Sequence, residues 1–421
     1  MQPTSPAPVS DRAQILDVLR GIAILGIFLN NIFGFTGYGF LTPVQKQTYS
    51  TYGADSVLSF LQIVFVEGKF YSLFSLLFGI GFSIILIRNE QKGINALKIF
   101  YRRLGVLFLF GALHIFLLWE GDILLLYALI GFILPIFRKC SDRSLLIWAV
   151  ALILSPIVID VIKLMVHGTP GEFMLPIAQS IDTKNGLPID DGWRTYLFQE
   201  GSGWQQWRNY QQSSFIYRFQ YILDSNRIPK VLGMFLAGFY VGRKMIYQNL
   251  NQYKPILKRL MFWGFVIGIP ANIAVAWFEA DEKRVPENWW GLLDTLFYAL
   301  GVVPLCLAYV SALCLHWIKK KKHNWLPFFA PVGRMALTNY ILQTVIGVSI
   351  FYGVGLGLGQ TIGPIYFIPI VIGIYALQVI FSNMWFKYFQ YGPLEWVWRK
   401  LTYGKALSLK KKSPVAPLVD H

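Results

Sequence analysis

Residues 57–88 read VLSFLQIVFVEGKFYSLFSLLFGIGFSIILIR, and this stretch decides the fold class. As one straight helix its 32 residues would measure about 48 Å, well beyond the roughly 30 Å of hydrocarbon in a bilayer. Glu67, Gly68 and Lys69 interrupt the run. Non-helical backbone at this depth must be covered by protein or line a wet cavity. We therefore predict a short re-entrant half-helix before the break and a membrane span after it.

The composition of the whole chain agrees with that stretch. Of 421 residues, 55% are apolar and only 14% are charged, whereas soluble domains have about 45–50% and about 25%. A soluble domain has no room for so much apolar surface, since single cores stop growing near roughly 250–300 residues. Three cysteines without motif spacing predict neither a disulfide framework nor a zinc site. The composition excludes a soluble enzyme, a disordered chain and a disulfide scaffold, and we expect a membrane protein without a metal.

Ten apolar stretches come close to the roughly 20 residues needed to cross a bilayer. They are residues 15–34, 69–88, 101–119, 122–138, 145–166, 229–247, 257–278, 291–318, 329–356 and 364–391. We predict an all-α polytopic membrane helix bundle with about ten transmembrane helices, the re-entrant segment and an external helical cap. The expected parts are a five-helix membrane half over 1–166, the cap over 167–228, a second membrane half over 229–405 and a basic tail over 406–421.

The basic residues gather on one side of the predicted bundle. The amino terminus, the even-numbered connections and the carboxyl tail, together with the span ends on their side, hold 27 Lys and Arg against 6 Asp and Glu, a net of +21, while the rest of the chain carries a net of −5. The positive-inside rule then predicts that both termini are cytoplasmic and that the cap lies outside the cell membrane. Orientation thus explains the formal net charge of +16, and we expect the lipid bilayer as a partner and no nucleic acid.

Ionisable side chains inside membrane spans are costly, so each is a functional candidate. Arg20 and Asn31 in the first span are eleven residues apart, and so are Arg103 and His114 in the third. Eleven residues make about three helical turns, so each pair shares a helix face at a vertical separation of roughly 16 Å. If both faces line one cavity, its inner mouth is cationic and its deep end can handle protons. Such a mouth suits a phosphate-bearing ligand, since guanidinium groups bind phosphate bidentately.

Further polar residues extend this candidate site. They are Arg102 and Arg334 at the cationic mouth, Glu120 and Asp122 near His114, and Asn30, Glu67, Lys69, Asn339 and Gln343 as cavity lining. Each group also has a structural alternative. Arginines anchor helix ends among lipid headgroups, amides form hydrogen bonds between helices, and acids at the end of a span belong to the outer loop. His114 itself is compatible with a buried structural histidine.

Five short motifs stand in order along the chain. They are residues 16–23 (LDVLRGIA), 74–79 (FSLLFG), 114–127, 333–340 (GRMALTNY) and 392–404. In these motifs the chain resembles the YeiB-like family, whose carboxyl half is known as domain of unknown function 418, over essentially residues 12–405. YeiB-like proteins are distantly similar to transmembrane acyltransferases, namely the acyltransferase-3 family and lysosomal heparan-α-glucosaminide N-acetyltransferase.

The distant similarity implies acyl transfer across a membrane, from cytoplasmic acetyl-CoA or another acyl-CoA to an acceptor outside, such as a sugar or glycan. The shared feature is an Arg-Gly pair in the first span, here Arg20 and Gly21, followed by a polar residue eleven positions beyond the arginine. That residue is His in acyltransferase-3 proteins and Asn31 here. The active-site His of the heparan enzyme matches Thr42 here. We therefore expect His114 to supply the base.

The expected mechanism assigns a role to each polar group. Neutral His114 would remove a proton from the acceptor, and Asn31 would donate a hydrogen bond to the developing oxyanion. Glu120 or Asp122 would fix the His114 tautomer or bind the acceptor. Two other functions stay open: a transporter or channel for a small polar or anionic solute, which the broken segment favours, and a structural or sensory protein whose cap binds a ligand. A homodimer is one assembly that we expect.

Overall fold

The computed structural model describes residues 14–91, 93, 95–189, 194–198, 203–280, 288–319, 324–404 and 407–411. These residues form helices and no β-strand, which confirms the predicted all-α class. The α-helices are α1 (Gln14–Phe35), α2 (Pro43–Gln47), α3 (Tyr52–Phe65), α4 (Lys69–Glu90), α5 (Ala96–Leu117), α6 (Leu124–Gly131), α7 (Asp142–Val166), α8 (Met174–Lys184), α9 (Gly203–Asp224), α10 (Arg227–Arg243), α11 (Lys254–Ala280), α12 (Trp289–Lys319), α13 (Ala330–Arg334), α14 (Ala336–Phe351), α15 (Pro364–Tyr388) and α16 (Pro393–Tyr403). The 3-10 helices are η2 (Tyr38–Phe40), η3 (Leu134–Lys139), η4 (Thr195–Leu197) and η5 (Leu326–Phe329).

Seven helical segments of the described chain are long and apolar enough to cross a membrane, so this is a multi-pass membrane protein. They are α1, the α3–α4 segment, α5, α7, α11, α12 and α15. α10 and α14 are shorter, with 17 and 16 residues. The predicted fourth span, 122–138, is wrong as one continuous helix, because it holds the eight-residue α6 and then η3. Pro135 is the physical reason, since proline lacks an N–H and crowds the preceding turn.

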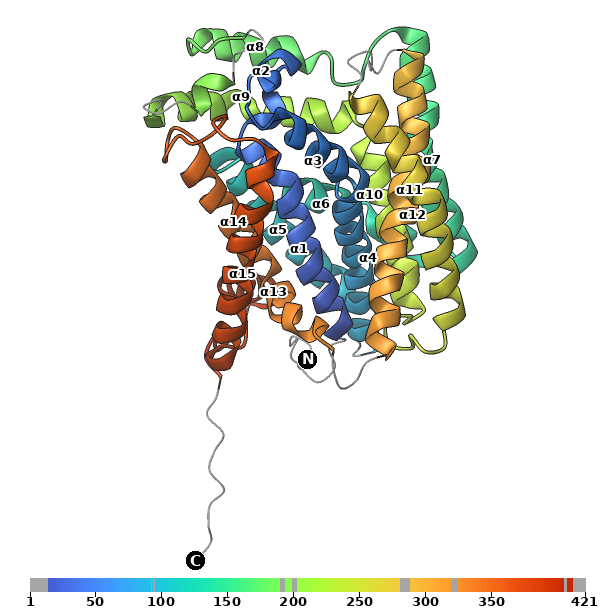
Figure 1. The fold of residues 1–421 in the computed structure, drawn as a ribbon. Coiled ribbons are helices and arrows are strands. Elements are labelled where there is room, and N and C mark those ends of the chain that lie inside the picture. The colour runs from blue at the N-terminus through green and yellow to red at the C-terminus, as the bar shows by residue number, and fades with distance from the viewer. Residues whose placement is uncertain are drawn as a thin grey trace, which may run out of the picture.

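The break predicted at Glu67, Gly68 and Lys69 lies between α3 and α4. Gly68 has a φ of 81°, in the left-handed region that favours glycine, and a Cβ there would lie 2.6 Å from Tyr298 Oη. α3 runs obliquely near one end of the bundle and packs on both α11 and α15 (Figure 1). The half-helix therefore bridges two helices that are far apart in the sequence.

The two ends of the bundle differ (Figure 1). α8 and α9 lie across one end, which we call the cap face, whereas α1 begins and α15 ends at the opposite end, which we call the tail face. Two hydroxyls of α9 join the two cap helices, because Ser213 and Tyr217 donate to the carboxylate of Asp182 on α8 at 2.5 and 2.6 Å. The predicted helical cap is thus present as a hydrogen-bonded layer.

α1 is the central helix and packs on α4, α12, α13, α14 and α15. Its contact with α13 depends on two glycines. A Cβ on Gly21 would lie 2.2 Å from a carbonyl oxygen of η5, and a Cβ on Gly333 would lie 1.8 Å from the carbonyl oxygen of Asp17. Only glycine allows backbones to approach this closely. The contact brings Arg20 and Arg334, the sequence neighbours of these glycines, to the wall of one cavity.

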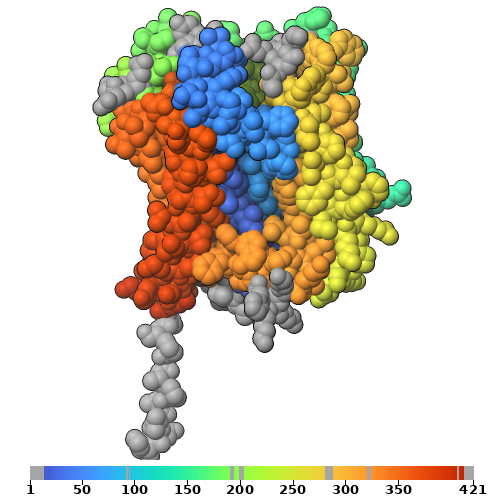
Figure 2. Space-filling view, in the orientation of Figure 1, coloured from blue at the N-terminus to red at the C-terminus, as the bar shows by residue number. Residues whose placement is uncertain are grey.

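One side of the bundle is hollowed between α15 and the α11–α12 pair (Figure 2). α1 and α4 are visible at the bottom of the hollow, and α3 borders it toward the cap face. Elsewhere the outer helices expose large apolar side chains, for example Val158 and Met165 on α7 and Leu377 on α15. In a membrane protein such side chains face lipid.

Candidate functional site

A cavity of about 680 Å³ lies in the tail-face half of the bundle, and we call it the tail-side cavity. Its described charged lining residues are five arginines and one carboxylate: Arg20, Arg88, Arg103, Arg334, Arg399 and Glu395. Leucine, isoleucine and phenylalanine side chains, mainly from α1, α4 and α5, make up much of the remaining wall. The cavity therefore combines a cluster of positive charge with a long apolar surface.

Aromatic rings and one acid hold the arginines of the tail-side cavity in place. Arg20 Nη1 lies 2.7 Å from Asp17 Oδ1, one helical turn away. The guanidinium of Arg103 stacks 4.1 Å from the ring centre of Trp398, and that of Arg334 stacks 3.7 Å from a phenylalanine ring of α15. Stacking uses the face of a guanidinium and fixes the direction of its N–H edge. The positive charge of the cavity is thus pre-oriented.

Glu395 ties α16 to the start of α14 at this cavity. Its carboxylate accepts hydrogen bonds from the backbone N–H of Leu337 and Thr338 at 2.8 and 3.1 Å, and from Thr338 Oγ1 at 2.7 Å. Burial raises the pKa of Glu395. An acid at a helix N-terminus satisfies donors that have no partner within the helix. This bond positions α16, which carries Trp398 and Arg399.

The structure separates the arginines that the sequence grouped together. Arg20, Arg103 and Arg334 line the tail-side cavity, but Arg102 does not. Arg102 is exposed, and its Nη2 donates to the carbonyl oxygen of Leu401 on α16 at 3.1 Å. Adjacent residues of a helix point about 100° apart, so only one of the two neighbours can face the cavity. Arg88 and Arg399 also line the tail-side cavity, but neither was predicted as a site residue from the sequence.

A second cavity, of about 530 Å³, lies in the cap-face half, and we call it the cap-side cavity. Its polar wall consists of Asn30, Asn31, Tyr71, Glu120, Arg194, Tyr217, Arg218, Gln220, Tyr221 and Arg227. Val66 and Gly68 of the α3–α4 break also line it. Three residues proposed from the sequence, Asn30, Asn31 and Glu120, are therefore brought together here.

Only a thin partition separates the two cavities. Ile27 of α1, Ile123 before α6 and Tyr340 of α14 line both of them. Tyr340 is buried, with 4% of its surface exposed, and its hydroxyl donates to the carbonyl oxygen of Gly121 at 3.4 Å. We call these three side chains the septum. If each cavity held a ligand, the two ligands would come closest to each other at the septum.

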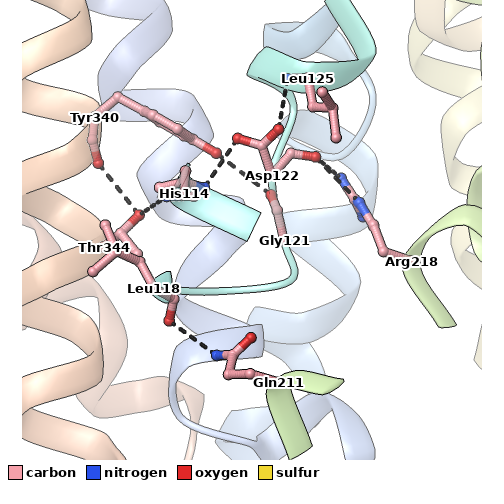
Figure 3. A network of polar contacts seen from close by, with 9 residues as sticks. All are labelled: His114, Leu118, Gly121, Asp122, Leu125, Gln211, Arg218, Tyr340 and Thr344. Atoms are coloured by element: carbon pink, nitrogen blue, oxygen red, sulfur yellow. Dashed lines mark hydrogen bonds and ion pairs between the residues drawn. The ribbon is translucent and has the colours of Figure 1, made fainter. Parts of the chain in front are cut away.

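Three polar side chains lie in a row behind Tyr340 of the septum (Figure 3). They are the hydroxyl of Thr344, the imidazole of His114 and the carboxylate of Asp122. Thr344 Oγ1 is 3.0 Å from His114 Nε2, and His114 Nδ1 is 2.9 Å from Asp122 Oδ2. The contact of Nδ1 with Asp122 Oδ2 lacks the alignment of a hydrogen bond, but its short distance places the carboxylate where it can favour a proton on Nδ1. Nε2 can then accept the hydroxyl proton of Thr344. The row joins α5, the α5–α6 connection and α14, although Thr344 is 230 residues from His114.

Backbone contacts hold Asp122 in position for this row. Its Oδ1 accepts a hydrogen bond from Leu125 N at 2.6 Å at the start of α6. Its carbonyl oxygen accepts hydrogen bonds from Arg218 Nε and Nη2 at 3.2 and 2.8 Å. An imidazole beside a fixed carboxylate is an arrangement that general bases use. The row can therefore take up a proton once a substrate reaches it.

The structure corrects the prediction of one shared cavity. Asn31 lines the cap-side cavity, the arginines line the tail-side cavity, and His114 lines neither of them. Only 1% of the surface of His114 is exposed, and its ring centre lies 5.1 Å from that of Tyr340. The bulk of Tyr340 is the physical reason, because it fills the space between the imidazole and both cavities.

Four residues expected in the substrate cavity line neither cavity. Asn339 donates to Val332 O and to Ser382 Oγ, both at 3.2 Å, and Gln343 donates to Gln378 Oε1 at 2.8 Å. These bonds join α14 to its neighbours, as amides commonly do between membrane helices. The other two are Glu67 and Lys69 at the α3–α4 break, where Lys69 Nζ donates to a carbonyl oxygen of α3 at 2.6 Å. Among the described residues no cluster of three or more His, Cys, Asp or Glu could hold a metal ion.

Comparison with known proteins relates the chain to several bacterial sequences. Residues 241–405 match the family described as "Protein of unknown function (DUF418)". The chain is 31% identical to "Uncharacterized protein YxaH" of Bacillus subtilis (strain 168), over 99% of this chain and 100% of the relative. It is 29% identical to "Uncharacterized protein YeiB" of Escherichia coli (strain K12), over 94% and 97% of the two chains. No solved structure matches it significantly.

Proposed function

The chain belongs to the YeiB-like DUF418 family, and for this member we propose that it is an integral membrane acyltransferase. It takes an acetyl or other acyl group from acyl-CoA in the tail-side cavity and delivers it to an acceptor in the cap-side cavity. One observation carries the proposal: two cavities meet at a septum, and the buried row of Thr344, His114 and Asp122 lies directly behind it.

The proposal assigns the tail face to the cytoplasm of a cell membrane. The termini, connections and span ends on the side of the two termini together hold the net charge of +21 counted above, against −5 on the other side. An excess of Lys and Arg marks cytoplasmic loops. Both termini are then cytoplasmic, and the cap helices face outside. Acyl-CoA, a cytoplasmic metabolite, has access to the tail-side cavity from that side.

The tail-side cavity suits acyl-CoA in both charge and shape. The five arginines can bind the phosphates of CoA, and the apolar wall can take its acyl-bearing arm. Arg20 and Ile27 are seven residues apart on α1, or roughly 10 Å along the helix axis. The pantetheine arm is longer than this. The thioester therefore reaches the septum while the phosphates stay on the arginines.

At the septum the acceptor and the thioester can react. The acceptor oxygen or nitrogen forms a bond to the carbonyl carbon, the C–S bond breaks, and the acceptor proton passes to His114 Nε2 and then to the CoA thiolate. Asn31 donates to the oxyanion, a contribution of roughly 10²–10³ in rate for one such donor. The step requires Tyr340 to turn aside, because its ring covers the imidazole, and Thr344 to release Nε2, because its hydroxyl occupies that nitrogen.

A transporter is the second candidate, and the α3–α4 break is the observation that favours it. Gly68 and Val66 of the break line the cap-side cavity, and broken helices are common at transporter binding sites. Alternating access, however, opens a transporter to one side at a time. Here cavities are present on both sides of one septum, which suits two ligands that enter from opposite faces.

The donor site can be tested with substitutions at the neighbouring residues Arg102 and Arg103. Acetyl-CoA or CoA should raise the Tm of the detergent-solubilised full-length protein, since a ligand of the folded state stabilises it by mass action. Arg103→Gln should reduce the shift, because Arg103 lines the tail-side cavity. Arg102→Gln is the matched control and should keep the full shift, because Arg102 lies outside that cavity.

Two results of this experiment count against the proposal. Wild-type protein that shows no Tm shift at millimolar CoA has no donor site. Equal losses of the shift in the two variants would mean that CoA binds by surface charge and not in the tail-side cavity. Transport of radiolabelled solute into vesicles without any acyl transfer would favour the transporter.

A further inference from the structure

Arginine dominates the charged wall of the cap-side cavity. Arg194, Arg218 and Arg227 line it, whereas Glu120 is its one carboxylate among the residues that the structure describes. Arg194 Nη1 lies 4.0 Å from Glu120 Oε1, so one positive charge is already balanced. The cavity keeps a net positive charge, which the positive-inside rule does not explain, since the cap face is the acidic side of the molecule.

Within the described part of the chain, the partners of Arg218 and Arg227 are neutral groups. No carboxylate lies within 4.0 Å of either guanidinium among the described residues. Arg218 donates to the carbonyl oxygen of Asp122. Arg227 Nη2 donates to Tyr221 Oη at 3.0 Å, and its guanidinium stacks 4.6 Å from the ring centre of Tyr71. These contacts orient both groups but leave their charges without an ion pair.

Some polar atoms in this wall are buried without a hydrogen-bond partner among the described residues. Arg227 Nε and Glu120 Oε2 are two of them. A buried polar group without a partner costs free energy, and a charged group costs more than a neutral one. A ligand that offers an anionic oxygen to Arg227 and a hydroxyl to Glu120 would satisfy both atoms.

From these contacts we infer that the cap-side cavity binds an anionic acceptor, one that carries a phosphate or carboxylate next to a hydroxyl or amine. The anion is held by Arg218 and Arg227, and Glu120 accepts a hydrogen bond from the acceptor. The identification of the bound anion as an acyl acceptor rests on the proposed function, but the anion site itself can be tested without any acyl transfer. The same phosphate chemistry is offered by a soluble phosphate ester or by a lipid headgroup.

The test is modification of arginines by phenylglyoxal in the wild-type full-length protein, with each modified residue quantified by mass spectrometry. Glycerol 3-phosphate is the soluble probe, and glycerol is its uncharged match. Nanodiscs of phosphatidylcholine with or without phosphatidylglycerol provide the lipid arm. Arg208 is exposed on α9 outside both cavities and serves as the internal control, and Arg103 separately reports binding in the tail-side cavity.

We expect the anionic probe to slow modification of Arg218 and Arg227 at least threefold and to leave Arg208 unchanged. Protection by glycerol 3-phosphate identifies a soluble phosphate ester as a sufficient ligand, and protection by phosphatidylglycerol alone identifies a lipid headgroup. Either result supports the inference. Unchanged modification of Arg227 in every arm, or equal protection by glycerol, would overturn it.

Variants add a measurement of affinity. Arg227→Gln should weaken binding of the protecting anion by roughly tenfold or more, as expected for the loss of one charge-assisted hydrogen bond. Arg208→Gln should leave the affinity unchanged. If Arg227 is protected but the protein never transfers an acyl group, the anion site is supported and the proposed function is refuted. Transfer to an uncharged acceptor without protection would refute the anion site alone.

Discussion

The contact between α1 and α13 allows a quantitative prediction for Gly333→Ala. A Cβ at Gly333 would lie 1.8 Å from the carbonyl oxygen of Asp17, whereas ordinary contact begins at 3.4 Å. The two backbones would have to separate by about 1.6 Å. Both atoms belong to rigid structure, the added carbon and a helix carbonyl, so no flexible side chain can absorb the change. Overpacking of this kind costs about 1–3 kcal/mol and occasionally more.

Gly105 on α5 is the matched control, because a Cβ there would meet nothing within 4 Å. Alanine at a helix interior is favoured over glycine by about 0.5–1 kcal/mol. Gly333→Ala should therefore lower the Tm of the purified protein, and Gly105→Ala should leave it unchanged or raise it. Unfolding in detergent, followed by intrinsic fluorescence or circular dichroism, measures both.

The same substitution should also affect the tail-side cavity, because Arg334 follows Gly333 directly and Arg20 precedes Gly21. If Gly333→Ala and Gly105→Ala unfold at the same temperature, the close packing of α1 on α13 is refuted. The account of how Arg20 and Arg334 are brought together then fails as well.

Three further predictions concern the septum, the topology and a buried acid. Tyr340→Ala should join the two cavities and let protons leak across the membrane of reconstituted vesicles, as measured with an enclosed pH dye. Tyr340→Phe should show no proton leak. An alanine variant without a leak would contradict the role of Tyr340 in separating the cavities. A cysteine at Lys184, exposed on α8, should react with an impermeant maleimide in intact cells, whereas Cys140 near the tail face should react only after lysis; the reverse pattern inverts the topology. Burial raises the pKa of Glu395 above 4.5, so its stability contribution is present below that value and is lost as the pH rises through the folded pKa. The Tm of the wild type relative to Glu395→Gln should thus be lower at pH 7.5 than at pH 4.5, and a rise would show that the shift has the opposite sign.

Much of the fold follows from apolar length and local chemistry. The predicted first span, 15–34, is α1, and the predicted tenth, 364–391, is α15 with its end moved by three residues. The break at Gly68 was also predictable, because a 32-residue apolar run is too long for one crossing. The break in the predicted fourth span was not predicted, because the span was assigned from its apolar length alone and the effect of Pro135 was not considered.

The candidate site was predictable only where it depends on one helix. Arg20 and Arg103 do line a common cavity, although the eleven-residue spacing related Arg20 only to Asn31 and Arg103 only to His114. It could not show that Tyr340, from a helix more than 200 residues further along, separates Asn31 from these arginines. Contacts such as His114 with Thr344 join distant segments and leave no periodic signal in the sequence.

The arginines of the cap-side cavity could not be predicted from the sequence for a different reason. Arg218 and Arg227 lie within the polar segment predicted as the cap, 167–228, where charged residues are common and carry no penalty that would single them out. Only the three-dimensional structure shows that both point into a cavity bounded by membrane helices. Their importance could not be derived from composition.

The central claim is that His114, oriented by Asp122, takes the acceptor proton during acyl transfer. The most direct measurement is transfer of radiolabel from acetyl-CoA to membranes that contain the acceptor, by purified wild-type protein and by His114→Ala and His114→Gln. We predict transfer by the wild type, and its loss in both variants while the CoA-induced Tm shift is retained, because the arginines on α5 lie roughly 16 Å away along the helix. Transfer by His114→Ala at a near wild-type rate, or none by the wild type, would contradict the account.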